Sequence, residues 1–329
     1  MEMNNAVRQG AVSLIRMILL LFGVSLFSFV LVVSSPIDPV TAFVGAESGV
    51  SEEYKAQTAE YWGLERPPVE RYVIWLKNAL CGDMGTSLAL RQPVAKILAE
   101  RVTASLALMA AAWVLSGILG FVLGVACGAN QYGVFDKIMR TFCFVLSSTP
   151  VFWIGLLLLM IFSIYLGWFP LGLSVPIGKM ASEVTIWDRL YHLALPALTL
   201  SVTGISSIAL HTRQKLIDVL NSDYVLFARA RGENRWSIIK RHGLRNIAIP
   251  AVTLQFASFS ELFGGSVLAE NVFSYPGLGS AASLAGNRGD VPLLLGVALF
   301  SVLFVFAGNL IANLLYGALD PRIREGNKR

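Results

Sequence analysis

One acidic residue stands inside an otherwise apolar stretch and is the first candidate for chemistry. Glu261 lies within the run 256–268, three residues after Ser258 and six after Gln255. An acid among apolar residues costs free energy in a membrane and is by default a candidate functional group. On a continuous helix Ser258 shares the face of Glu261. The three residues predict a polar lining of a path through the protein; the alternative is a structural hydrogen bond across an interface to a partner chain.

The second candidate is a basic segment between two apolar runs. From Arg213 to Arg245 eight basic residues face three acidic ones, a net charge of +5. Asp223 can cap a helix over 224–231, and Gly232 can close it because glycine adopts the left-handed conformation. A slim helix of this kind fits the groove of a partner protein, and a basic loop held on anionic lipid is the open alternative. The residues assigned to it are Asp223, Tyr224, Ala228, Arg229, Ala230, Arg231 and Gly232, with Pro250 as the start of the next apolar run.

Other reactive side chains are scattered. The histidines, His192, His211 and His242, lie far apart in the sequence, so we favour ordinary interface polarity over a metal site or proton relay. The pair Gly178-Lys179 is followed by Met180 and lacks the spacing of an ATP-binding loop. We therefore expect no ATP site, no metal site and no cofactor in this chain.

The composition is that of a membrane protein. Hydrophobic residues make up 55% of the 329 residues and charged residues only 14%, whereas soluble domains carry about 25% charged residues. The basic residues cluster beside apolar runs, which favours membrane orientation over nucleic-acid binding. The three cysteines are widely spaced and predict neither a disulfide framework nor a metal cage: Cys81, Cys127 and Cys143.

Six apolar runs are long enough to cross a bilayer, which takes about 20 helical residues. We predict an all-α polytopic membrane protein with an uncleaved first helix. The fourth and fifth runs are interrupted by Pro196, Gly204 and Gly264, which is typical of helices that pack on other helices or line a cavity. The predicted spans lie near 14–33, 104–128, 142–166, 192–211, 250–270 and 291–317.

The distribution of charge predicts the orientation. A basic loop over 213–249 and a basic tail after the sixth span place both termini in the cytoplasm. Residues 34–103 then lie outside, and we expect two short helices there, over 51–61 and 68–80, against the outer mouth. Residues 270–279 are rich in turn-forming residues and are either a re-entrant piece at an outer gate or a plain extracellular loop.

Gly232, followed after fourteen residues by Ile247, Ala248, Ile249 and Pro250, resembles the EAA-type loop of ABC importer permeases. Leu226 replaces the acid of the general pattern, and the spacing is longer; both departures resemble the dipeptide, oligopeptide and nickel branch. Segments similar to that branch follow in order along about 300 residues: a first helix over 15–38, YWGLERPPVERYV at 61–73, GDMGTS at 82–87, RQPV at 91–94, STPVFW at 148–153, LPALT at 195–199, ENVFSYPGLG at 270–279 and LDPR at 319–322.

The resemblance implies a type I ABC importer-like permease, one transmembrane domain over 1–329, in the inner or plasma membrane of a prokaryote. It implies an importer for peptides or for nickel or metal chelates, working by alternating access. The implied partners are a paralogous second permease, two ABC ATPase subunits that bind ATP and Mg, an extracytoplasmic solute-binding protein and membrane lipid. The chain itself is then no enzyme.

Two rival functions are weaker. An ion-gradient-driven secondary transporter is expected to show an inverted repeat, and the sequence has none. An enzyme with its active site in the membrane needs several ionisable groups at one depth, and Glu261 stands nearly alone.

Overall fold

The computed structural model describes residues 2–36, 38, 40–41, 51–61, 63–180 and 182–319. These residues are helical or lie in turns and connections, apart from one isolated β-bridge between Thr86 and Pro93. The all-α prediction is therefore confirmed. The chain divides into two compact units: unit 1 contains residues 1–105 and 276–307, and unit 2 contains residues 106–275 and 308–329.

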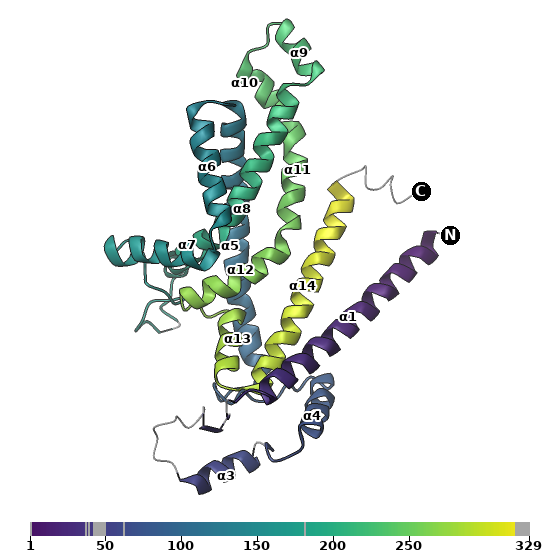
Figure 1. Ribbon diagram of the computed structural model, residues 1–329, viewed down its shortest axis with the longest axis vertical. Coiled ribbons are helices and arrows are strands. Elements are labelled where there is room, and N and C mark those ends of the chain that lie inside the picture. Colours follow the sequence, from purple (N-terminus) through teal and green to yellow (C-terminus); the bar gives the residue numbers. More distant parts are fainter. Residues whose placement is uncertain are drawn as a thin grey trace. The chain divides into compact units, whose positions relative to one another are not determined.

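Several helices have the length and composition of membrane spans (Figure 1). In the described part of the chain, four pass this test singly, and two bent helix pairs bring the number to six if each pair is one span. The prediction of a polytopic membrane protein is confirmed, and the predicted six spans are consistent with the upper number. The cytoplasmic placement of the termini stays a prediction, and the basic residues after 319 lie outside the described residues. The four single helices are α1 (Glu2–Val33), α5 (Val94–Ala129), α8 (Ile186–Leu220) and α14 (Val291–Leu319).

The third span is not the single helix expected over 142–166. Helix α6 (Val134–Ser148) ends before Pro150, and α7 (Val151–Leu158) continues into the π-helix η1 (Leu159–Tyr165) at an angle of 110° to α6. Thr149 is extended, with φ −96° and ψ 132°, which is the conformation that a following proline imposes. The break falls at Ser147, Ser148, Thr149 and Pro150, and we read this short polar interruption as part of one long apolar run.

The fifth span also differs from the prediction. Pro250 does not begin it, because one helical run continues through α10 (Arg235–Ile238), the π-helix η2 (Ile239–Gly243) and α11 (Leu244–Ala257). A proline inside a membrane helix is tolerated when neighbouring groups satisfy the freed backbone. The run then bends by 59° before α12 (Phe259–Val272).

Unit 1 holds both short helices near their predicted bounds, α3 (Glu52–Tyr61) and α4 (Pro68–Leu80), and also α13 (Leu278–Asn287), which we did not predict. Tyr72 fastens α4 to α1. Its hydroxyl lies 2.8 Å from Ser25 Oγ, and its ring packs against Phe22 and Phe29. The rotation of α4 about its own axis is fixed by this contact.

A buried carboxylate fixes the start of α14. Asp290 is fully buried and accepts hydrogen bonds from Ser87 Oγ at 2.6 Å, Ala89 N at 2.9 Å and Leu293 N at 3.1 Å. The last of these bonds caps the helix, and the first two hold residues 87–89 against it. The connection between α4 and α5 is therefore tied to α14 within unit 1.

In unit 2, glycines let α5 and α8 approach closely. A Cβ atom at Gly124 would lie 2.6 Å from the Ala209 carbonyl oxygen, and one at Gly120 would lie 2.8 Å from Ile208 Cβ. Gly128 continues the row one turn later, against Leu216. Small residues four apart are a common means of close helix contact in membranes.

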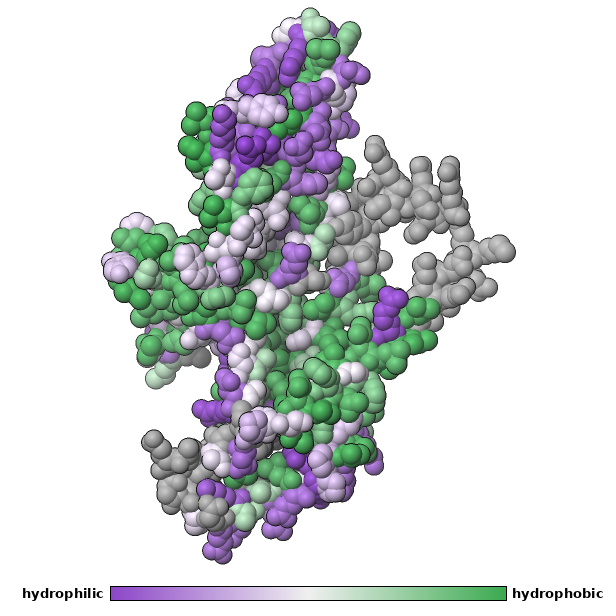
Figure 2. All heavy atoms as spheres, viewed as in Figure 1, coloured by the Kyte–Doolittle hydropathy of each residue, from purple (hydrophilic) through white to green (hydrophobic). Residues whose placement is uncertain are grey.

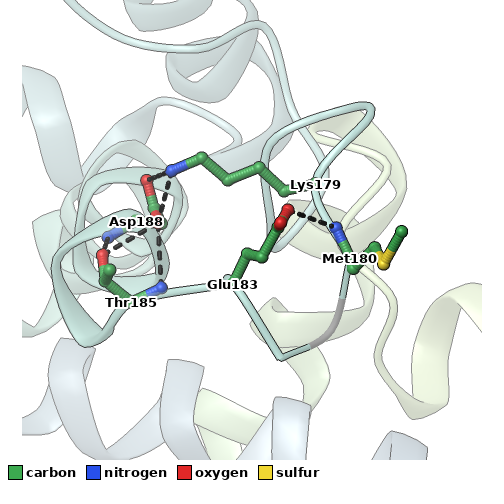
Figure 3. Close-up of polar contacts among 5 residues, drawn as sticks. All are labelled: Lys179, Met180, Glu183, Thr185 and Asp188. Carbon is green, nitrogen blue, oxygen red and sulfur yellow. Dashed lines mark hydrogen bonds and ion pairs between the residues drawn. The ribbon is translucent and has the colours of Figure 1, made fainter.

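The connection before α8 folds back onto that helix (Figure 3). Lys179 Nζ donates to both carboxylate oxygens of Asp188 at 2.9 Å, and Thr185 and Asp188 form a capping box at the start of α8. Further back, Leu173 N donates to Phe273 O at 2.9 Å. Lys179, excluded above from an ATP site, thus has a structural ion pair.

Replacing Gly124 with Ala should destabilise the chain by about 1–3 kcal/mol, because the added methyl group overpacks the contact between α5 and α8. The measurement is the midpoint of thermal unfolding of the detergent-solubilised chain. Gly23→Ala is the matched control, since nothing lies within 4 Å of its Cβ position. Equal midpoints for the two variants would contradict the close contact.

Candidate functional site

The predicted docking helix exists as α9 (Asp223–Ala230), at one end of unit 2 (Figure 1). Its N-cap is Ser222, one residue before the predicted cap, and Asp223 is the first helical residue. Gly232 has φ 84°, as its predicted closing role requires, and its N–H donates to Arg229 O at 2.9 Å. Glu233 N donates to Ala228 O at 3.2 Å, so the last turn is closed by two backbone bonds.

One face of α9 is anchored in its own chain. Val225 is fully buried and Ala228 is 5% exposed. Both pack in a cluster with residues of α5, α8, α10, η2 and α11: Ala129, Leu216, Leu220, Ile238, Ile239 and Ile247. The methyl group of Ala228, one of the predicted coupling residues, faces the inside of unit 2, and its coupling role stays a prediction. A cluster that joins α9 to five other elements can pass a displacement of α9 directly to α8 and α11.

The opposite face of α9 is open and partly apolar. Leu226 is 66% exposed and Phe227 65% exposed, and Tyr224 beside them is held by Asn246 Nδ2 at 3.3 Å. Arg229, Ala230 and Arg231 are also exposed. Figure 2 shows mainly hydrophilic side chains over α9 and α10, so these apolar residues stand within a polar surface. Our sequence reasoning missed Leu226 and Phe227, although two large apolar residues within a basic loop are a recognisable signal.

A buried ion pair lies near this cluster. The Arg213 guanidinium donates to both oxygens of Asp136, from Nε at 2.5 Å and from Nη2 at 2.7 Å, and Tyr132 N donates to the same carboxylate at 2.9 Å. Asp136 is fully buried. The pair joins the first turn of α6 to α8, and Arg235 adds a hydrogen bond to the Ala129 carbonyl. The sequence analysis included Arg213 only as one of eight basic residues of the loop, and no sequence pattern predicts its pairing with Asp136.

Gln255 joins α11 to α5. Its Nε2 donates to Trp113 O at 2.6 Å and to Ser116 Oγ at 3.1 Å, while Trp113 Nε1 donates to Gln255 O at 3.1 Å. Gln255 is only 5% exposed, and its Oε1 has no partner among the described residues. It borders a cavity of about 440 Å³ with mainly apolar walls from α5 and α11.

The structure does not bring the three predicted path residues together on one helix face. Ser258 is the bend between α11 and α12, and its hydroxyl donates to Gln255 O at 3.0 Å. Glu261 is exposed in the first turn of α12, beyond the bend. The continuous helix that we assumed between them was wrong, while the role of each residue stays a prediction.

The remaining candidates are separate. His192 Nδ1 lies 2.8 Å from Gly172 O, and His242 Nε2 lies 3.8 Å from Glu233 Oε2. No group of three metal-ligating side chains forms within the described ranges, and the three cysteines are free. In the segment 270–279, α12 extends to Val272, and the turn that follows buries Phe273 and Tyr275.

Comparison with known proteins gives consistent matches. The sequence profile described as "Binding-protein-dependent transport system inner membrane component" matches residues 120–325. The chain is 34% identical over 305 residues to the oligopeptide transport system permease protein AppB of Bacillus subtilis, covering 92% of this chain and 95% of that protein. It is 33% identical over 318 residues to the di/tripeptide transport system permease protein DppB of Pseudomonas aeruginosa, covering 92% and 94%. It is 32% identical over 320 residues to the dipeptide transport system permease protein DppB of Escherichia coli, with the same coverage.

Replacing Arg213 with Met should lower the stability of the chain by about 3–5 kcal/mol, because the Asp136 carboxylate is then buried without a counter-charge. Changing both residues, Asp136→Leu with Arg213→Met, should recover most of that loss. The measurement is the thermal midpoint of the solubilised chain. A single variant as stable as the double variant would contradict the role of the pair.

Proposed function

Because the chain belongs to the family of binding-protein-dependent transport system inner membrane components, we propose that it is the permease subunit of an ATP-driven ABC importer. It is a multi-pass membrane protein, and the proposed complex contains a second permease, two ATPase subunits and an extracytoplasmic solute-binding protein. The observation that carries the proposal is the similarity to transport permeases over 92% of the chain.

We infer that short peptides are the cargo. The names of three relatives refer to oligopeptides, di- and tripeptides, and dipeptides. The sequence alone left peptides and nickel or metal chelates as equal alternatives, and these relatives favour peptides. Transport of a short peptide needs a path that accepts both charged ends and a polar backbone.

The proposed energy coupling uses both faces of α9. The exposed apolar side chains of Leu226 and Phe227 bind a groove of an ATPase subunit, and exposed Arg229 and Arg231 pair with acids on its walls. The buried face carries the displacement to α8 and α11 through the cluster around Val225. The ATPase subunits bind ATP and Mg, and this chain moves between outward-open and inward-open states.

The proposed path runs along α11 and α12. Gln255 lies before the bend, Ser258 lies at the bend, and Glu261 lies beyond it in α12. A helix that is already interrupted at Ser258 can change its angle without breaking further backbone hydrogen bonds. We therefore propose that Glu261 and the bend face the path and that the two segments tilt relative to each other during transport.

The function is tested with the assembled complex in liposomes. We expect labelled trialanine to accumulate only with ATP and the solute-binding protein present, and an imposed proton or sodium gradient to have no effect without ATP. Uptake driven by an ion gradient alone would favour the secondary transporter. Accumulation of nickel but of no peptide would reverse the cargo assignment.

Replacing both Leu226 and Phe227 with Ala should reduce peptide uptake at least about tenfold, because buried apolar side chains dominate the energy of an interface. ATP hydrolysis should no longer respond to the loaded solute-binding protein. Uptake and hydrolysis are measured in the same liposomes. Trp187→Ala is the control, since Trp187 is 74% exposed at the start of α8. Normal uptake in the double variant would remove α9 from the coupling mechanism.

A further inference from the structure

Unit 1 contains a pocket that the proposed mechanism does not use. It has a volume of about 370 Å³ and is bounded by α4, by the connection that precedes α4, and by side chains of α1 and α14. Its walls include apolar groups, among them Phe29 and Pro292, and several polar ones. Ligand pockets in proteins begin at about 300 Å³, so the pocket can hold a molecule of a few residues.

Three hydrogen-bond donors of α4 line this pocket in a row. Arg71, Trp75 and Asn78 follow one another at intervals of four and three residues, which places them on one face of the helix. Trp75 Nε1 is buried and has no acceptor among the described residues. Arg71 is half-buried, and no described carboxylate pairs with it. Burial alone lowers the pKa of Arg71 below its ordinary value. Among the described residues, the row therefore presents a buried N–H group without an acceptor and a guanidinium group without a carboxylate partner.

The pocket is held in shape from two sides. Tyr72, next to Arg71, is clasped by α1 through Ser25 and Phe29, and its ring stacks on Trp75 at 6.1 Å. On the other side, Asp290 holds residues 87–89 against the start of α14, where Leu88 and Pro292 contribute to the wall. The Trp75 ring and the pocket wall are thus held in place by contacts within unit 1, which favours ligand binding.

A carboxylate is the acceptor that suits these donors. A buried N–H group without an acceptor costs free energy, and a guanidinium group forms its best hydrogen bonds, often two in parallel, with a carboxylate. Glu60 lines the same pocket and can receive an ammonium group. An inorganic anion would leave both Glu60 and most of the volume unused.

We propose that this pocket binds a short peptide in zwitterionic form, with its C-terminal carboxylate on Arg71 and Trp75 and its ammonium group toward Glu60. The inference rests on the proposed function and on the predicted outside location of residues 34–103. The permease itself then binds its cargo at the outer surface, separately from the path along α11 and α12.

The test is equilibrium dialysis of labelled trialanine against the permease–ATPase complex in nanodiscs, without the solute-binding protein or ATP. Trp75→Phe keeps an aromatic ring against Tyr72 but removes the N–H donor, and it should weaken binding about tenfold. Arg71→Gln should weaken it about thirtyfold or more, because a charged hydrogen bond is lost. The controls Trp187→Phe and Arg288→Gln change exposed residues outside the pocket and should leave binding unchanged.

Competition separates the possible ligands. Trialanine should displace the label, whereas its C-terminal amide should compete at least about tenfold more weakly. Equal competition by the amide, or no binding of trialanine to the wild-type complex at millimolar concentration, would overturn the inference. The inference would also be overturned if Arg71→Gln and Trp75→Phe bound trialanine normally but bound the solute-binding protein more weakly. The carboxylate that Arg71 and Trp75 bind would then belong to the solute-binding protein and not to the peptide.

The proposed function is judged by a different readout. ATP-dependent uptake of trialanine with the solute-binding protein present supports the importer even if the pocket binds nothing. Binding in the pocket without any ATP-dependent uptake would leave this inference standing and contradict the proposed function.

Discussion

The buried pair of Asp136 and Arg213 is the interaction on which the position of α9 in unit 2 depends. Two charges removed from water must satisfy each other closely, so α6 and α8 are fixed in one relative position. The apolar cluster around Val225 includes Leu216, one turn further along α8, and holds α9 in place. Helix α9 is thus a short element whose position is set by two long ones, as its proposed coupling role requires.

Unit 1 uses the same physical principle with different groups. Asp290 accepts hydrogen bonds from three donors near the start of α14. The hydroxyl groups of Tyr72 and Ser25 share a hydrogen bond, and the Tyr72 ring packs on Phe29 of α1. Polar groups in these places specify where short elements attach, since apolar contact alone has little directional preference. Two donors on α4 differ from these groups: Trp75 Nε1 has no acceptor among the described residues, and no described carboxylate pairs with Arg71.

The sequence predicted well what depends on local chemistry. The bounds of α4, the short basic helix and the conformation of Gly232 follow from residue types within a few positions. The bend after α6 and the one at Ser258 were missed because short polar interruptions, SSTP at 147–150 and QFASFSE at 255–261, also occur inside continuous membrane helices. Asp136 and Arg213 are 77 residues apart, and one sequence contains no information that pairs them. The burial of Ala228 within unit 2 could not be predicted, because a small residue suits a buried contact as well as an external groove.

The glycine row of α5 has a mechanical consequence. At Gly120, Gly124 and Gly128 the backbone of α5 lies close to carbonyl oxygens of α8, those of Ile205, Ala209 and Arg213. Sliding or rolling of one helix on the other would bring their backbone atoms into steric clash. We therefore expect α5 and α8 to move together as one rigid body. Deformation in unit 2 must then be concentrated at joints where the helical ladder is already broken, at Pro150 and at Ser258. The stiffness of one helix pair thereby decides where this protein is able to bend.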